Sequence, residues 1–286
     1  MTRNLTRRKF LGIAAASAAG LALYSGEFAR HELDITRLTI ALPNLPEAFR
    51  GFTIAQISDI HYHEFSEAFF VRHVVHTVNS LKPDLVALTG DFITASPLTK
   101  HQAHKHIVPC AELLAQINSP LRYAVLGNHD ALINPDAMTA ALVSHGIPVL
   151  ANRYVPIEKD GQRIWLSGIE DACIQRPELS LAVPHPDFRQ NQPVILLGHE
   201  PDFADIVVRH GVDLMLSGHT HGGQIRIPFM GPHFLPELGD KYVEGLFSIG
   251  PMQLYVNRGI GTVGLPARFR CPPEITLITL EKKTRA

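Results

Sequence analysis

The chain has 286 residues, a formal net charge of −1 and three cysteines. Its 45% hydrophobic content excludes an intrinsically disordered chain, and the near-zero net charge gives no indication of a nucleic-acid-binding surface. Cys110, Cys173 and Cys271 are odd in number and widely spaced, so we expect isolated buried thiols, with one disulfide as the alternative if the protein is exported. After an N-terminal signal segment, the remaining length is sufficient for one α/β domain with a full core.

The N-terminus carries a signal-like segment. Thr6-Arg7-Arg8-Lys9-Phe10-Leu11 resembles a twin-arginine export motif, and the Ala-rich apolar run 11–23 behind it has the length of a signal h-region. Residues 1–34 are therefore expected to form a twin-arginine signal peptide or an N-terminal membrane tether. This predicts export by the twin-arginine machinery to the periplasm or to the outer face of the cytoplasmic membrane. Ala16-Ser17-Ala18 resembles a cleavage site but lies early in the run, so cleavage stays open.

Strand-like and helix-like segments alternate along the rest of the chain. Short apolar runs predict strands at 38–42, 53–58, 85–89, 122–126, 194–197 and 214–216. Helices are predicted at 67–81, 100–117, 135–145 and 201–209. The segments 154–159 and 162–167 flank Asp160-Gly161, which predicts a β-hairpin, and the tail from 224 is expected to be mostly β, including 254–257 and 275–280. This mixture of βα units and β-hairpins indicates two packed sheets with helices outside.

Five short polar blocks follow almost directly after these apolar runs. They are Asp59-Ile60-His61, Gly90-Asp91, Gly127-Asn128-His129-Asp130, Gly198-His199-Glu200 and Gly218-His219-Thr220-His221. Carboxylates and imidazoles without Cys suit Mn²⁺, Fe or Zn²⁺ at a hydrolytic site, and the carboxyl ends of strands are where open α/β sheets place their sites. A Gly before four of the candidate ligands lets the backbone approach closely. Where a ligand pair is spaced i, i+2, an extended backbone would point both side chains the same way.

The ordered set of blocks resembles the calcineurin-like metallophosphoesterase superfamily, whose pattern is D-x-H, G-D, G-N-H-D/E, G-H and G-H-x-H. The tail, from Gly222-Gly223-Gln224-Ile225 to Leu265-Pro266-Ala267-Arg268, resembles the twin-arginine-exported bacterial phosphodiesterase branch. The resemblance covers the chain from about residue 52 onward. It implies that 35–286 form a catalytic domain with an α/β fold, a four-layer α/β/β/α sandwich of two mixed sheets flanked by helices.

The resemblance also implies two divalent transition-metal ions, with Mn²⁺ expected and Zn²⁺, Fe²⁺ or Ni²⁺ as alternatives. Asp59, His61, Asp91 and His221 would hold the first ion, and Asp91, Asn128, His199 and His219 the second, with Asp91 bridging. A bridging anion reduces the repulsion between two adjacent cations. His129 is expected to face the phosphate as a catalytic residue, and Asp130 to fix the tautomer of His129 through a hydrogen bond.

These residues predict a binuclear metal-dependent phosphodiesterase that acts on an envelope or extracytoplasmic substrate by attack of a metal-bound hydroxide. Lys and Arg are sparse around the blocks, which favours diesters over the more highly charged monoesters. Arg258, Arg268 and His233 are the candidate substrate-binding residues, because Arg suits forked phosphate contacts and His233 lies in a loop after the last ligands.

Two alternatives remain. One is a pyrophosphatase of a nucleotide-linked lipid precursor of the UDP-diacylglucosamine type, a substrate handled on the cytoplasmic face, so that an export signal counts against it. The other is a non-catalytic metal-binding module, which the complete set of candidate ligands disfavours. His101, His104 and His106 could form a second metal site, but their polar, helix-like context favours a solvated helix face.

Overall fold

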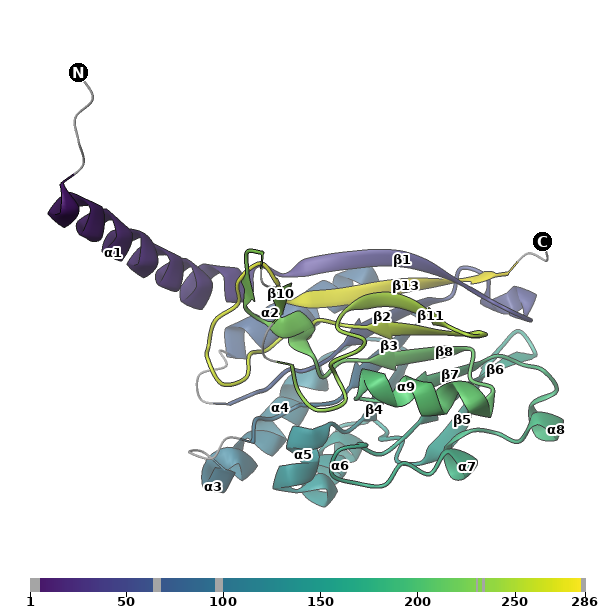
Figure 1. The fold of residues 1–286 in the computed structure, drawn as a ribbon. Coiled ribbons are helices and arrows are strands. Elements are labelled where there is room, and N and C mark those ends of the chain that lie inside the picture. The colour runs from purple at the N-terminus through teal and green to yellow at the C-terminus, as the bar shows by residue number, and fades with distance from the viewer. Residues whose placement is uncertain (1–5, 64–67, 96–99, 230, 233–234, 284–286) are drawn as a thin grey trace.

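Two β-sheets pack face to face in the computed structural model, and helices cover their outer faces (Figure 1). The structure describes residues 6–63, 68–95, 100–229, 231–232 and 235–283. Apolar side chains fill the space between the sheets and the space under the helices on each side. The four-layer α/β/β/α sandwich expected from the family resemblance is therefore confirmed.

The first sheet has five strands, and its second strand, between β1 and β2, is the last described strand of the chain. In spatial order the strands are β1 (Asp34–Leu42), β13 (Glu274–Lys282), β2 (Thr53–Ile57), β3 (Leu85–Thr89) and β4 (Leu121–Val125). β13 pairs in parallel with β1 and antiparallel with β2, while β2, β3 and β4 are parallel. The sheet is mixed, as expected.

The second sheet has six strands. In spatial order they are β11 (Gly245–Ile249), β12 (Met252–Val256), β8 (Leu214–Ser217), β7 (Val194–Leu197), β6 (Gln162–Gly168) and β5 (Arg153–Lys159). The β5–β6 hairpin is confirmed, and its turn residues Asp160 and Gly161 both have positive φ, 49° and 71°, as a type I′ turn requires. A separate two-stranded ribbon pairs β9 (Arg226–Ile227) with β10 (Gly231–Pro232).

Helices lie on both outer faces. Those packed on the first sheet are α2 (Ala68–Leu81), α4 (Ile107–Leu114) and α6 (Pro135–Ser144), with α3 (Lys100–Ala103) and α5 (Asn128–Ile133) beside them. The second sheet is covered by α7 (Leu179–Ala182), α8 (Pro186–Arg189) and α9 (Ala204–Val207). The helix predicted at 100–117 is interrupted by a 3₁₀ turn, His104–His106. The helix predicted at 201–209 consists of three short helical pieces. The sequence did not predict α5.

Strand β3 shows why the sequence of a strand in this fold is apolar at almost every position. Leu85 and Ala87 face the core between the sheets, while Val86 and Leu88 face the core under the helices, and all four side chains are buried. A strand covered on both faces has no position left for a polar side chain until it ends. The polar ligand blocks therefore begin where the strands leave the sheet. Cys110, Cys173 and Cys271 are free thiols, as expected, with Cys173 half-buried.

The N-terminal helix α1 (Arg7–Leu23) projects away from the domain and buries none of its side chains (Figure 1). The helical segment Arg7–His31 is long and apolar enough to span a membrane, a property that it shares with signal sequences. The residues after α1 contact the domain, since Ser25 and Ala29 are buried and the Ser25 carbonyl accepts the backbone N–H of Arg268.

Candidate active site

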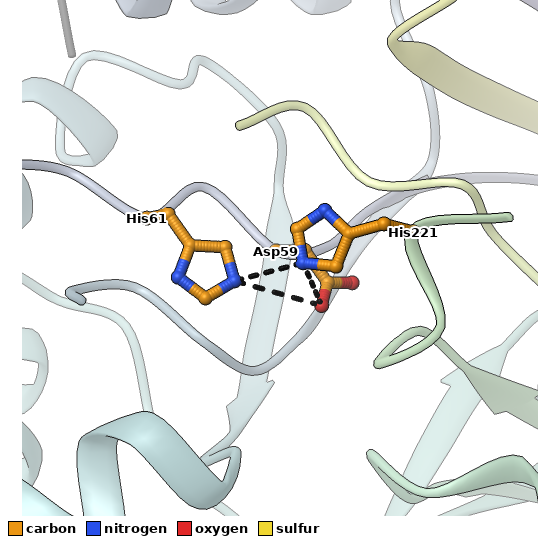
Figure 2. A group of neighbouring side chains, drawn as sticks. All are labelled: Asp59, His61 and His221. Carbon is orange, nitrogen blue, oxygen red and sulfur yellow. Dashed lines mark hydrogen bonds and ion pairs between the residues drawn. The ribbon is translucent and has the colours of Figure 1, made fainter. Parts of the chain in front are cut away.

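One set of candidate ligands converges from strands of both sheets. Asp59 and His61 follow β2 of the first sheet, and His221 follows β8 of the second. Nε2 of His61 lies 2.9 Å from Nε2 of His221, and Oδ1 of Asp59 lies 3.4 Å from the His221 nitrogen (Figure 2). We call Asp59, His61 and His221 the first ligand group, and all three are buried.

A second ligand group, Asp91, His199 and His219, lies directly beside the first. Oδ2 of Asp91 is 3.2 Å from Nε2 of His199 and 3.4 Å from Nε2 of His61. This one carboxylate oxygen therefore faces a histidine of each group, which is the position expected of a bridging ligand. Burial raises the pKa of Asp91, but the charge of His199 is the main opposing cause and holds the pKa of Asp91 well below its usual value. Burial lowers the pKa of His199, but Asp91 in turn raises it well above its ordinary value.

Hydrogen bonds to the remote ring nitrogens fix the histidines for ligation. Nδ1 of His199 donates to the Thr89 carbonyl, and Nε2 of His219 donates to the Glu237 carbonyl, both across 2.7 Å. The Thr94 hydroxyl donates to the His61 carbonyl and lies 3.2 Å from Nδ1 of His61, from which it can accept. Each of these bonds leaves a lone pair on the ring nitrogen that faces the ligand groups.

Burial also keeps three of these imidazoles neutral. It lowers the pKa of His219 to about 4, and the pKa values of His61 and His221 lie well below the ordinary value for the same reason. Neutral imidazole is the form that binds a metal ion. Burial raises the pKa of Asp59 to about 6, against the opposing charge of His199. A cation beside Asp59 would reverse that shift.

The residues present fit a pair of divalent cations. Oδ1 of Asn128 is buried and has no hydrogen-bond partner among the described residues, although an unpaired buried polar atom is costly. Nε2 of His61 and Nε2 of His221 face each other at close range, which is unfavourable for two lone pairs unless a proton or a cation lies between them. Imidazole nitrogens, carboxylate oxygens and one amide oxygen are a donor set that suits transition metals at hydrolytic sites.

The ligand segments are not extended, so the i, i+2 argument for an extended backbone does not apply to them. Asp59, His61, Asp91, His219 and His221 all have positive φ, between 48° and 73°. This left-handed backbone costs energy for a residue with a side chain, and such strain is typical of functional sites. It turns the chain back sharply at the end of each strand, and tight turning rather than extension brings Asp59 and His61 together.

Glycines before the ligands permit close approach of the backbone, as expected. A Cβ at Gly218 would collide with Oγ of Ser58 and Oδ2 of Asp59. A Cβ at Gly127 would collide with Oδ1 of Asp91 and lie 2.7 Å from Nε2 of His199. The close approach is used for hydrogen bonding, because both oxygens of Asp59 accept the backbone N–H of His219 at 3.0 Å.

His129 lines the pocket over the ligands, but Asp130 does not fix its tautomer. Nδ1 of His129 accepts the backbone N–H of Ala95 across 2.8 Å, which leaves the proton of the neutral ring on Nε2. Asp130 is fully buried and instead accepts the backbone N–H groups of Phe92, Ile93 and Gly127. Asp130 therefore joins the Asp91 segment to the Asn128 segment, and its predicted role beside His129 is wrong.

The prediction that Arg258 and Arg268 bind substrate is also wrong. Arg268 is fully buried, and its guanidinium donates to the main-chain carbonyls of Arg258, Gly259, Gly261 and Cys271. Arg258 forms ion pairs with Asp34 and Glu274, at 2.7 and 3.1 Å. Neither guanidinium is available for a phosphate. The third candidate, His233, lies outside the described residues.

A pocket of about 430 Å³ opens over both ligand groups. Its polar lining includes Asp91, Asn128, His129, His219 and His221. The remaining lining residues are Thr220, Gly223, Gln224, Ile225, Leu235, Pro236, Val263 and Leu265. The volume is in the range of small-molecule sites, so the ligand groups are accessible to a substrate.

Sequence reasoning missed the residues that orient the ligands. Thr89, Thr94 and Glu237 act through a main-chain carbonyl or a hydroxyl, and only the proximity of Thr89 and Thr94 to Asp91 could have suggested them. It also missed a group formed by Asp171, Cys173 and Glu200, whose ligand atoms lie within 4.8 Å of one another.

The histidine-rich stretch before α4 does not form a metal site in the part of the chain that the structure describes. No metal-capable group there includes His104 or His106. The ring of His106 packs edge-on against Tyr62, with 5.8 Å between ring centroids. The side chain of His101 lies outside the described residues.

Comparisons with known proteins agree with this geometry. The family model of the calcineurin-like phosphoesterases matches residues 52–223. The chain is 37% identical over 293 residues to the uncharacterized metallophosphoesterase YkuE of Bacillus subtilis (strain 168), covering 98% of this chain and 99% of YkuE. It is 31% identical over 288 residues to the phosphodiesterase YaeI of Escherichia coli (strain K12), covering 96% and 99%.

One solved structure, the NAD nucleotidase of Haemophilus influenzae, matches with a TM-score of 0.50 and 16% identity. The match covers 73% of this chain and 45% of that one. At this identity the likeness concerns the fold alone.

Proposed function

Because the chain belongs to the calcineurin-like phosphoesterase family, we propose that it is a phosphodiesterase with a two-metal centre. One observation carries the proposal: Oδ2 of Asp91 lies within 3.4 Å of a histidine nitrogen from each ligand group. With Asn128 beside them, the two groups offer separate ligand sets that share one carboxylate. Mn²⁺ is the proposed metal, and Zn²⁺, Fe²⁺ and Ni²⁺ are the alternatives.

Different residues of the protein would bind the metals, donate a proton and support the backbone of the site. The ligand groups would hold two cations, which supply a Lewis acid for the phosphate and a lowered pKa for water. His129 holds its ring proton on Nε2 because Ala95 occupies Nδ1. His129 lines the pocket, and this proton can pass to the ester oxygen that leaves the phosphorus. Asp130 acts through the backbone, by holding the segments of Asp91 and Asn128 together.

The charge around the pocket supports a diester substrate. Among its described lining residues there is no Lys or Arg. The guanidinium of Arg258 forms ion pairs with carboxylates, and that of Arg268 donates to main-chain carbonyls. Arg226 is paired with Glu244. A monoester carries about one more negative charge than a diester at neutral pH. Among the described lining residues no guanidinium is present to pair with that additional charge. The similarity to YaeI, whose name is phosphodiesterase, supports the same assignment.

We propose further that the chain is exported by the twin-arginine machinery and acts on the periplasmic side of the cytoplasmic membrane, either released or retained by α1. The paired Arg7 and Arg8 at the start of α1 and the apolar length of the segment Arg7–His31 support this location.

The test is a comparison of two chromogenic esters. Full-length protein is stripped of metal, refilled with Mn²⁺, Zn²⁺, Ni²⁺ or Fe²⁺, and assayed on bis(p-nitrophenyl) phosphate and p-nitrophenyl phosphate. We expect no hydrolysis after chelation, recovery with metal, and faster cleavage of the diester. A monoester rate about tenfold higher than the diester rate would make the protein a phosphatase. Elemental analysis that finds only trace metal in folded, reconstituted protein would contradict the two-metal centre.

A further inference from the structure

Five of the residues that line the pocket over the ligand groups are large and apolar. They are Ile225, Leu235, Pro236, Val263 and Leu265, which we call the apolar wall. The ligand residues and the apolar wall line the same pocket. A diester whose phosphate lies over the ligands therefore places one of its ester groups against hydrocarbon. A hydrocarbon chain is favoured there over a sugar or a nucleoside, because each polar group set against the wall would lose its hydrogen bonds to water.

The apolar wall is held in place by one buried side chain. The Gln224 amide donates to the carbonyls of Val263 and Leu265, at 3.1 and 2.9 Å, and its oxygen accepts the N–H of Val263 at 2.9 Å. The wall is therefore formed before any substrate arrives, as is usual for binding pockets.

Three large apolar side chains in this part of the chain are exposed to solvent. Leu265 is 65% exposed although it lines the pocket, and Ile227 and Phe229 in the adjoining ribbon are 44% and fully exposed. Backbone hydrogen bonds between Arg226 and Phe269, and between Gln224 and Phe269, join this ribbon to the loop 262–270. Exposed apolar residues next to a binding pocket mark an interaction site.

The segment directly after the apolar helix α1 is attached to the same loop. The backbone N–H of Arg268 donates to the Ser25 carbonyl at 3.0 Å, and Gly26 lies against the Pro266 carbonyl. Figure 1 shows α1 leaving the domain beside β10, at the end of the molecule where this loop lies. With α1 in a bilayer, Leu265 and Phe229 would lie at the membrane surface.

We propose that the substrate is a membrane glycerophospholipid, with its phosphodiester over the ligand groups and its acyl chains against the apolar wall. This inference rests on the proposed function and adds the substrate class. In the reaction, a water oxygen forms a bond to phosphorus, and the phosphorus–oxygen bond to the headgroup or to diacylglycerol breaks. The leaving oxygen takes a proton, so the products are an alcohol and a phosphomonoester.

The test compares two diesters that differ only in their acyl chains. Metal-loaded, full-length protein is assayed on dioleoyl phosphatidylglycerol in dodecyl maltoside micelles and on glycerophosphoglycerol, its deacylated counterpart. Bis(p-nitrophenyl) phosphate reports the proposed phosphodiesterase activity independently. We expect kcat/KM to be at least about tenfold higher for the acylated diester, since each methylene bound in an apolar pocket contributes discrimination of about this size.

Each outcome decides a different claim. Equal rates on the acylated and deacylated diesters, with bis(p-nitrophenyl) phosphate still cleaved, would overturn the lipid assignment and leave the proposed function standing. Failure on all three diesters would overturn the proposed function itself.

A pair of variants tests the apolar wall. Leu265→Asn is expected to bring the ratio of acylated to deacylated rates toward one. Leu181→Asn in α7, where the leucine is 56% exposed, is the matched control and should keep the ratio. If the ratio of acylated to deacylated rates is the same in the two variants, the acyl chains do not contact the apolar wall. That result would overturn the assignment of a glycerophospholipid substrate bound in this way.

Discussion

The backbone N–H of Ala95 donates to Nδ1 of His129 across 2.8 Å, so the proton of the neutral ring is on Nε2. His129→Ala removes this proton donor and leaves both ligand groups complete. We expect turnover of a diester to fall about 10²- to 10⁴-fold, the usual range for one positioned acid or base. Steady-state kinetics together with elemental analysis should show this loss with both metals retained.

The control for this variant is His210→Ala, because His210 is exposed and precedes β8, whereas His219 and His221 follow the other end of that strand. It should keep full activity. Loss of metal from His129→Ala would make His129 a ligand, and a loss of only a few-fold in turnover would remove it from the chemistry.

Asp91→Ala should abolish paired metal binding. Oδ2 of Asp91 faces a histidine of each ligand group. Oδ1 of Asp91 accepts the backbone N–H of His129 at 2.9 Å. Without this carboxylate, two adjacent cations would repel each other. Metal content and calorimetric titration with Mn²⁺ measure the effect. Asp213→Ala, which removes a carboxylate that accepts the Val194 N–H at the start of β7, should keep both metals. Two metals retained by Asp91→Ala would disprove the bridge.

Asp130→Asn should destabilise the fold. Its two oxygens accept N–H groups from Phe92, Ile93 and Gly127, so an amide nitrogen in place of either oxygen would face a donor. We expect the free energy of unfolding to fall by about 1–3 kcal/mol, the cost of a buried donor left unpaired. Urea denaturation measures this, with the exposed Asp136→Asn as the control. Unchanged stability of the Asp130 variant would show that these bonds contribute nothing.

Gly218→Ala should weaken metal binding more than Gly198→Ala, although each glycine precedes a histidine ligand. At Gly218 a Cβ would collide with Oγ of Ser58 and Oδ2 of Asp59, which is itself a ligand. At Gly198 the atoms nearest to the Cβ would belong to the side chains of Ile169 and Met215, at 3.0–3.2 Å. Mn²⁺ titration of the two purified variants compares them. Equal affinities would mean that the Asp59 segment can move without loss.

Replacement of both Arg7 and Arg8 by Lys should leave the protein in the cytoplasm if the proposed export route is correct. The variant keeps the positive charge and the apolar run, and a twin-arginine receptor reads the pair itself. Cell fractionation and immunoblotting measure the location. Replacement of Lys9 by Arg serves as the control. Unchanged envelope localisation of the double variant would indicate another export route or a plain anchor.

The ligand positions could be predicted because they are encoded locally. Asp91 and His219 each follow an apolar strand and a glycine, and a strand that is buried on both faces ends where polar residues begin. The left-handed backbone could not be predicted from the same residues. It depends on contacts distant in sequence, such as the N–H of Gly261, which donates to the Asp59 carbonyl at 2.7 Å.

The roles of Asp130 and Arg268 were missed for a related reason. Their partners are main-chain groups, which have no signature in the sequence. Phe92 precedes Asp130 by 38 residues, and the carbonyls around Arg268 belong to residues that carry no acidic side chain. Helix α5 was missed because Gly127-Asn128-His129-Asp130 has the composition of a turn, whereas Asp130 caps a helix that begins inside the block.

The place of β13 between β1 and β2 determines when the chain can fold. The ribosome makes β13 after every other described strand, so until then β1 and β2 each have an open edge where β13 should pair with them. Open edges invite pairing with other chains, and pairings between distant segments form slowly. The loop 257–261, which supports Asp59, is translated almost as late. Strand pairing in the first sheet and assembly of the ligand groups are therefore completed together, late in translation or after it.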